Sequence, residues 1–372
     1  MANPLAETGT GHPCRHRTAV PGALAALTAV LVLAVGPATA LAAHRGSPGT
    51  NPTTSSYGFN RPDAAALYGV DLFVANKGGN SVTELNASTH AHIATVTASK
   101  FAFNGPTALA VAGNDLFVAN GAGNSVTEVN AANRSLVRVL SGRAYSLSDP
   151  VALAADGSGN LFILSRGGSV KKVTVSSGKV GGTAAGARFA FDKPTGIVSV
   201  GNYLFVANSG GNSVTELDSV TMKLVRVLSG AKYAFDVPTG IAAHRGRVWV
   251  TNAGGRTVTE IASSTDGVVQ IVPNTADYLP RPGPIAYGDG YLFVASPPGA
   301  SPMITQVTPN NPATLPWMMC NTNGPYLFSN PRALAVYGTD LWVVNMGGAG
   351  GPAGNSLTEM NATSGALIKV VK

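Results

Sequence analysis

The sequence has few cysteines, few aromatic residues and few charged residues. Only two of its 372 residues are cysteines, aromatics make up 7% and charged residues 12%. So few charges argue against long solvated helices, and so few cysteines mean that stability has to come from packing. Helical periodicity is nearly absent. Glycine (45 residues) and apolar residues (45%) are plentiful, which favours many short strands joined by tight turns.

The first 43 residues have the pattern of a secretory signal peptide. A basic segment, Arg15-His16-Arg17, precedes the apolar run 23–35, and a Gly36-Pro37 break and small residues at 38–40 follow it. An uncleaved membrane anchor is the alternative. The 13 unbroken apolar residues are, however, short against the roughly 20 that a spanning helix needs. We therefore expect a secreted mature chain without a membrane span.

The charge and cysteine content of that mature chain limit its partners. Losing Arg15, Arg17 and Glu7 leaves 23 basic and 17 acidic side chains, a net of +6 over 329 residues. This mild excess favours anionic surfaces, but no run of like charge is present, so nucleic acid is not expected as a partner. Cys320 is the one cysteine left, so the mature chain should lack an internal disulfide. We expect Cys320 to be buried, and an intermolecular disulfide is the alternative.

A sequence repeat of about 44 residues makes up most of the rest of the chain. Residues 44–56 are rich in proline, serine, threonine and glycine and predict a flexible leader. From Tyr57 on, relatives of the segment 115–128 occur seven times. Their central aromatic residues, 44, 45, 43, 44, 44 and 49 residues apart, are Phe73, Phe117, Phe162, Phe205, Trp249, Phe293 and Trp342. This period is typical of a propeller blade and predicts an all-β, seven-bladed β-propeller over residues 57–372.

Each copy predicts four antiparallel strands. In the second copy they are Thr107–Ala112, Asp115–Asn120, Ser125–Asn130 and Leu136–Leu140, entered through Pro106. The second strand is apolar on both faces, so it should be buried between neighbouring blades. No strand is left over at either end of the chain, so we expect the ring to close by blade packing alone.

The repeats also resemble known families. Units such as Pro194-Thr195-Gly196-Ile197, followed by residues 201–208, are similar to the NHL and YVTN propeller repeats. The resemblance implies a propeller, and such relatives include secreted binding proteins, adhesion-associated modules and virginiamycin B lyase. A lyase of that kind implies a histidine and metal-binding carboxylates around the axis. Where lyase-like repeats often place an acid after the second strand, this chain has Asn76, Asn120, Ser165, Asn208, Asn252, Ser296 and Asn345.

Two sets of charged or polar residues invite a structural interpretation. Asp63 and Arg332 follow the entry prolines of the first and seventh copies, which predicts an ion pair across the ring closure, worth at most about 1 kcal/mol if exposed. Five third strands share one glutamate position, and we expect hydrogen bonds to Thr or Asn there rather than a metal ring. These glutamates are Glu84, Glu128, Glu216, Glu260 and Glu359.

The histidines offer little for catalysis. His90 and His92 have the spacing of metal ligands on one strand face, but no third ligand is evident, so a solvated strand edge is expected. His244 lies at the end of a first strand and is expected to be structural. We therefore predict no metal, no cofactor and no catalytic residue.

The repeat is most irregular in copies six and seven, where a binding site is predicted. The sixth copy inserts residues 296–301 after its second strand, and the seventh lengthens the same turn to 346–354. Insertions collect on one face of a repeat fold. The candidate residues for an anionic or aromatic ligand are Asp63, Arg281, Ser296, Trp317, Arg332, Asn345 and Met346. Loop variation without a ligand is the alternative.

The sequence thus favours a secreted, monomeric binding or scaffold module. Its partner would be a glycan, a lipid headgroup, a small aromatic molecule or a protein outside the cell. A lyase or hydrolase acting at the axial mouth is one alternative, and a self-associating cell-envelope protein is another.

Overall fold

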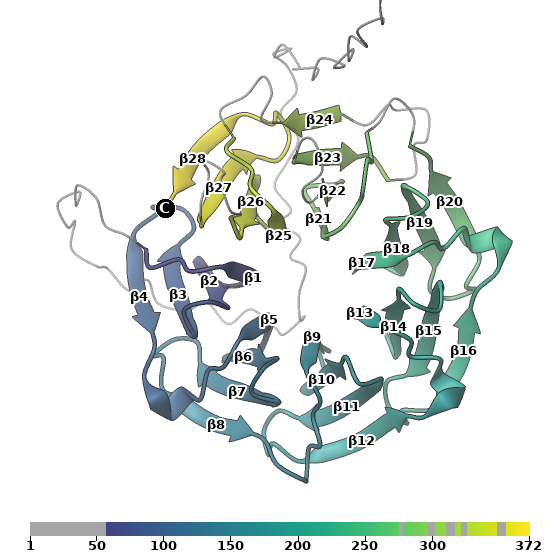
Figure 1. The fold of residues 1–372 in the computed structure, drawn as a ribbon, viewed down its shortest axis with the longest axis horizontal. Coiled ribbons are helices and arrows are strands. Elements are labelled where there is room, and N and C mark those ends of the chain that lie inside the picture. The colour runs from purple at the N-terminus through teal and green to yellow at the C-terminus, as the bar shows by residue number, and fades with distance from the viewer. Residues whose placement is uncertain (1–56, 275–277, 297–301, 310–316, 321–325, 348–354) are drawn as a thin grey trace, which may run out of the picture.

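The structure is a ring of seven four-stranded antiparallel sheets, which confirms the predicted propeller (Figure 1). It is a computed structural model that describes residues 57–274, 278–296, 302–309, 317–320, 326–347 and 355–372. The predicted signal peptide 1–43 and leader 44–56 lie outside these residues. Within each sheet the strands follow chain order, with the first strand near the axis and the fourth at the outer rim.

The strands of each blade come from one continuous segment of chain. Blades one to four contain β1 Pro62–Tyr68, β2 Asp71–Asn76, β3 Ser81–Asn86, β4 His92–Val96; β5 Pro106–Ala112, β6 Asp115–Asn120, β7 Ser125–Asn130, β8 Leu136–Leu140; β9 Pro150–Ala155, β10 Asn160–Ser165, β11 Ser169–Thr174, β12 Val180–Ala185; and β13 Pro194–Val200, β14 Tyr203–Asn208, β15 Ser213–Asp218, β16 Leu224–Leu228.

Blades five to seven repeat the arrangement with β17 Pro238–His244, β18 Arg247–Asn252, β19 Thr257–Ala262, β20 Val268–Val272; β21 Ile285–Gly288, β22 Tyr291–Ser296, β23 Met303–Val307, β24 Trp317–Cys320; and β25 Pro331–Tyr337, β26 Asp340–Asn345, β27 Ser356–Asn361, β28 Leu367–Val371. Among the described residues, three single-turn 3-10 helices, η1 Ser99–Phe101, η2 Ala187–Phe189 and η3 Ala231–Tyr233, lie in the loops that lead into blades two, four and five.

The strand boundaries of the second blade agree closely with the prediction. β6, β7 and β8 begin and end at the predicted residues, and β5 begins one residue earlier, at Pro106. Pro106 pairs with Asn120, and a bulge follows before Ala108 pairs with Ala119. Because proline has no N–H to donate, it occupies the first position of the strand, where the ladder begins.

The core lies between blades, as expected from strands that are apolar on both faces. All seven central aromatic residues are at most 2% exposed. Phe73 of blade one clusters with Leu116 and Val118 of blade two, and Trp342 of blade seven clusters with Leu72 and Val74 of blade one. Each such side chain contributes about 1.5 to 3 kcal/mol on burial. The packing therefore continues without a break around the ring.

Blades one and seven close the ring without exchanging a strand, as predicted. The Tyr57 N–H donates to the Lys372 carbonyl oxygen over 3.3 Å. The predicted ion pair is present, because Arg332 Nε lies 2.6 Å from Asp63 Oδ1. The Asp63 side chain is only 5% exposed. The limit of about 1 kcal/mol expected for an exposed ion pair therefore does not apply, because removing the partner of a buried charge costs more free energy.

Candidate functional site

Two kinds of loop meet on one face of the propeller, which we call the entry-loop face. An entry loop leads from the fourth strand of one blade to the first strand of the next, and a 2-3 turn joins the second and third strands. In blade two, the Gly121 N–H of the 2-3 turn donates to the carbonyl oxygen of Gly105 in the entry loop, over 3.0 Å. Binding residues on this face therefore come from both kinds of loop.

A repeated asparagine in the 2-3 turn clamps the next blade's entry loop. Its side-chain oxygen accepts the N–H of the residue before the entry proline, over 2.7 to 2.9 Å. The pairs are Asn80 with Gly105, Asn124 with Asp149, Asn212 with Val237 and, across the ring closure, Asn355 with Arg61. This clamp was not predicted, although its signal, an asparagine directly before the first serine of the third strand, recurs in the sequence.

The residues that end the second strands do not form a polar mouth at the axis. Asn120 is completely buried, and its amide donates to the hydroxyl oxygens of Ser125 and Thr127 over 3.2 and 3.0 Å. Asn345 is likewise 0% exposed and donates to Thr358. Each amide thus forms its hydrogen bonds with hydroxyl groups of the third strand of its own blade. Asn345 is therefore a structural residue, which corrects its placement in the predicted binding rim.

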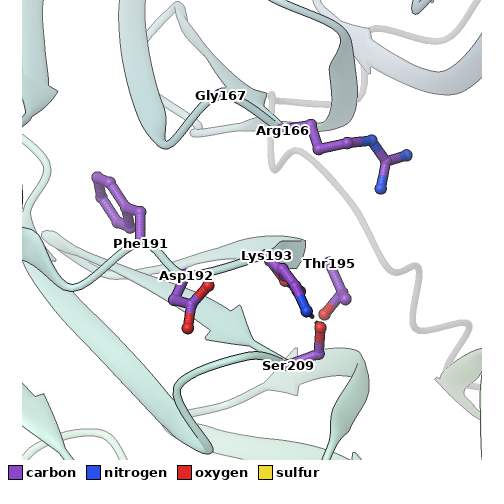
Figure 2. Close-up of a pocket in the computed structure, with 7 residues that line it drawn as sticks. All are labelled: Arg166, Gly167, Phe191, Asp192, Lys193, Thr195 and Ser209. Carbon is purple, nitrogen blue, oxygen red and sulfur yellow. Dashed lines mark hydrogen bonds between the residues drawn. The ribbon is translucent and has the colours of Figure 1, made fainter.

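A depression opens on the entry-loop face between blades three and four (Figure 2). The 2-3 turn of blade three is one residue shorter than that of blade two, and Gly168 stands where Asn124 makes the clamp. The depression has a volume of about 590 Å³, within the range of about 300 to 1,000 Å³ typical of ligand sites. It is lined by Arg166, Gly167, Phe191, Asp192, Lys193, Thr195 and Ser209.

The lining combines charged groups, hydroxyls and one ring. Figure 2 shows the turn with Arg166 on one side and the loop with Phe191, Asp192 and Lys193 on the other. Arg166 is 61% exposed and its Nε lies 2.5 Å from Asp149 Oδ2. Lys193 and Asp192 are exposed. Both donors and acceptors of hydrogen bonds thus line the depression.

Local packing fixes the loop that carries these groups. The ring of Phe191 stacks on buried Phe189, with centroids 5.5 Å apart and planes 9° apart, so one face of Phe191 is covered. The Gly210 N–H of the 2-3 turn of blade four donates to the Asp192 carbonyl oxygen over 3.0 Å. Ser209 Oγ donates to the Lys193 carbonyl oxygen over 2.9 Å. The loop is therefore held at three points.

The residues predicted for a rim on blades six and seven are not brought together by the described structure. Ser296 is buried at 1% exposure, which corrects its expected place at a surface. Asp63 and Arg332 pair in the ring closure. Arg281 is exposed on the entry loop of blade six, and Met346 is half-buried. Trp317 begins β24, and the inserted loops 297–301 and 348–354 lie outside the described residues.

The third-strand glutamates are structural, but their partners differ from the prediction. They pair with basic or amide side chains rather than with Thr or Asn: Glu84 with Arg134, Glu128 with Arg138, Glu216 with Arg226, Glu260 with Gln270 and Glu359 with His90. The glutamates are at most 2% exposed, and a buried carboxylate needs a cationic or strong donor partner, which a hydroxyl does not replace.

Burial perturbs two of these carboxyls strongly. Burial raises the pKa of Glu128 to about 7, although the Arg138 guanidinium opposes the change. Burial and the neighbouring Asp266 carboxylate raise the pKa of Glu216 to about 7, against the effect of Arg226. Neither glutamate lines the depression between blades three and four. These shifts therefore describe contacts in the third strands and not a catalytic group there.

His90 differs from its expected place on a solvated strand edge. It lies in the turn before β4 with a φ of 64°, and its Nε2 pairs with Glu359 of blade seven. His92 Nε2 is 2.9 Å from Thr95 Oγ1. His244 is structural as expected, since its ring stacks on Tyr287 at 4.3 Å. Within the described ranges, no group of three or more potential metal ligands occurs.

Two further findings bear on the predicted class of protein. Across the described part of the chain, none of the helices has the length and apolar character needed to cross a membrane. Cys320 is buried as expected. Cys320 is disulfide-bonded, and the expectation that the mature chain, without residues 1–43, has no internal disulfide stays a prediction.

Comparison with known proteins supports the fold. No protein-family model matches the sequence, and no curated protein matches it. Among solved structures, hydrazine synthase from Kuenenia stuttgartiensis aligns with a TM-score of 0.64 and 15% identity, covering 85% of this chain and 99% of that chain. The RRP9 WD40 repeats align with a TM-score of 0.63 and 12% identity, covering 81% and 94%.

A computationally designed protein, Ika8, also aligns, with a TM-score of 0.59 and 13% identity over 85% of this chain and 88% of that chain. At such low identities these similarities concern architecture only. They support a seven-bladed propeller, a fold typical of binding and scaffold modules, and leave the ligand to be inferred from this chain's own surface.

Proposed function

We propose that this protein is a secreted binding module that holds a small polar ligand, a sugar unit of a glycan, in the depression between blades three and four. The observation that supports the proposal is the lining itself. Arg166 and Lys193 donate hydrogen bonds, Asp192 accepts them, and Phe191 offers the partly exposed edge of a ring. Hydroxyl-rich ligands need donors and acceptors together, with an apolar surface beneath the sugar's C–H groups.

The position of the depression adds support. It lies where the 2-3 turn has lost a residue and the asparagine clamp, and ligand sites in repeat proteins gather where the repeat is interrupted on one face. Three points hold the loop, so the site is preformed, and a preformed site loses less free energy to ordering when it binds.

Secretion belongs to the same proposal. It is based on the pattern in residues 1–43, with 44–56 as leader and 57–372 as the propeller. We further propose that the repeats are of the NHL or YVTN type, because of units such as 194–197. The rim of blades six and seven, with Arg281 and Met346, is a second location for a ligand.

A glycan array tests the proposed function and separates the two locations. The full chain and two variants, R166A/K193A and R281A/M346A, are compared at equal concentration, and bound glycans are then measured by calorimetry. We expect R166A/K193A to weaken binding at least about tenfold, which corresponds to about 1.4 kcal/mol, with R281A/M346A unchanged. The reverse ranking would place the ligand on the second rim. Wild-type affinity in both variants would reject both sites.

Self-association is a second candidate, favoured by one feature of the outer rim. Five outermost strands expose a β-branched residue at their second position, between 38% and 45% exposed: Ile93, Val137, Val225, Val269 and Ile368. Outer edges of this kind can pair with another chain. Light scattering across a concentration series tests this, and a constant monomer mass would exclude it.

A further inference from the structure

A row of exposed cations follows the outer part of four consecutive entry loops. These loops lie between blades one and two, two and three, three and four, and four and five. The cations are separated by 43, 45 and 44 residues and are Lys100, Arg143, Arg188 and Lys232. All four side chains are exposed. We call this set the cationic arc.

Within the described residues, none of the four cations forms an ion pair. By contrast, Arg134, Arg138 and Arg226 on nearby strands and turns pair with buried carboxylates. The acids nearest in sequence to Arg188 and Lys232 are Asp192 and Asp236, four residues further along their loops and beside Gly210 and Gly254 of the 2-3 turns. The acid nearest to Arg143, Asp149, pairs with Arg166. The arc therefore presents positive charge that the fold itself does not neutralise.

Three members of the arc are held over buried rings. Lys100 Nζ is 5.2 Å from the centre of the Phe101 ring, Arg188 Cζ is 4.8 Å from that of Phe189, and Lys232 Nζ is 4.6 Å from that of Tyr233. The 3-10 helices η1, η2 and η3 set this position. They pack beside outermost strands, since η1 contacts β8 and η2 contacts β12 and β16, and in Figure 1 they appear as coils at the rim.

Stabilisation by the contacts between cations and aromatic rings does not explain why the arc has these four cations. The same ring position is filled by Tyr57, Tyr278 and Tyr326 at the three remaining blade junctions, but the residues before them in the sequence are Ser56, Asp277 and Pro325. Arg143 is exposed although it does not directly precede its ring, Tyr145. The cations are thus confined to one continuous part of the rim, as expected of a binding surface and not of a repeated packing device.

We infer that the cationic arc binds a linear acidic polysaccharide. One cation at each of four successive junctions suits a long partner with regularly repeated negative charges, because a small anion would contact one cation only. A nucleic acid is less favoured, since the rings under the cations are buried and offer no platform for stacking bases. The inference concerns different residues from the depression between blades three and four and does not depend on the sugar site proposed there.

The test compares two variants of equal charge. In the arc variant, Lys100, Arg143, Arg188 and Lys232 are all changed to Gln; in the control, Lys179, Lys223, Arg245 and Lys372, four exposed cations outside the arc, are changed to Gln. Binding of the full chain to polygalacturonate, dextran sulfate, neutral dextran and double-stranded DNA is measured at 50, 150 and 400 mM salt. We expect the arc variant to bind the acidic polysaccharides at least about tenfold more weakly at 50 mM salt, with a shallower salt dependence.

Several results would overturn the inference. They are equal losses in arc and control variants, no binding of either acidic polysaccharide by the wild-type chain, or tighter binding of DNA than of both polysaccharides. Circular dichroism and thermal unfolding check that the variants fold. If the arc variant does not fold, Arg143→Glu replaces it, because that side chain is not held over an aromatic ring. It is expected to weaken polysaccharide binding, while Arg245→Glu, at an exposed position outside the arc, leaves binding unchanged.

Discussion

The ion pair that closes the ring gives the sharpest test of how this propeller is held together. Arg332→Ala removes the partner of Asp63, whose side chain is 5% exposed and lies 2.6 Å from Arg332 Nε. An exposed pair contributes at most about 1 kcal/mol, whereas orphaning a fully buried charge costs about 3 to 5 kcal/mol. Arg332 is itself 42% exposed, and Lys77 Nζ stays 3.4 Å from Asp63 Oδ2.

We therefore expect an intermediate loss of about 2 kcal/mol for R332A. The double variant K77A/R332A should lose more than the sum of the two single losses, because only then does Asp63 lack both cations. For a chain of this size, 1 kcal/mol corresponds to roughly 2 °C in Tm, so R332A should melt about 4 °C lower. Urea unfolding gives the free energies, and calorimetry gives Tm.

The control removes a charge of the same sign elsewhere. Arg245 is exposed in the turn between β17 and β18, and R245A should stay within about 0.5 kcal/mol of wild type. A thermodynamic cycle over D63A, R332A and D63A/R332A then isolates the pair. The reasoning is refuted if the coupling energy is below about 0.5 kcal/mol, or if R332A and R245A unfold at the same urea concentration.

The remaining predictions concern other contacts between strands and blades. N355A removes the clamp on the Arg61 N–H across the ring closure and should lower the free energy of unfolding by about 1 kcal/mol, measured by urea unfolding. N124A, which removes the corresponding clamp between blades two and three, is the matched comparison. Equal unfolding rates of the two variants would show that the closure is no weaker than other blade junctions. Glu128 has its pKa raised to about 7 from an ordinary value of 4.5, so its contribution to stability is full below about pH 4.5 and is lost as pH rises through about 7. The stability of wild type relative to E128Q should therefore fall over that interval, and a pH-independent difference would contradict this. N120A removes donors to two buried hydroxyls and should lower the free energy of unfolding by about 2 to 3 kcal/mol; a loss below about 0.5 kcal/mol would show that these hydroxyls find other partners.

The blade architecture could be predicted because it is encoded locally. The second strand is apolar on both faces, and turn residues follow at short, fixed intervals, so Asp115–Asn120 could be bounded without reference to any distant residue. The partner of Asp63 was also accessible, since both it and Arg332 depart from their repeat position. The first and seventh blades are neighbours in a closed ring. Residues of opposite charge at the same position of these two blades therefore predicted a contact between them.

Other contacts were not accessible from the repeat alone. Glu84 pairs with Arg134, 50 residues later in the next blade, and nothing within one copy shows which side chain of the neighbouring turn reaches it. The depression between blades three and four has a visible signal, because Phe162 and Ser169 are one residue closer than Phe117 and Ser125. Its meaning depends on the asparagine clamp, which becomes apparent only when the blades are placed side by side.

The absence of strand exchange has a consequence for how the molecule is made. Each sheet is complete once its own segment of chain has been synthesised, so the blades can form one after another. The contact between blades one and seven has to wait until blade seven has been made. A circular permutant that begins at any entry loop, with the old ends joined, should reach the same ring. Tandem duplication of the segment that encodes one blade is likewise a short evolutionary route to a propeller with more blades.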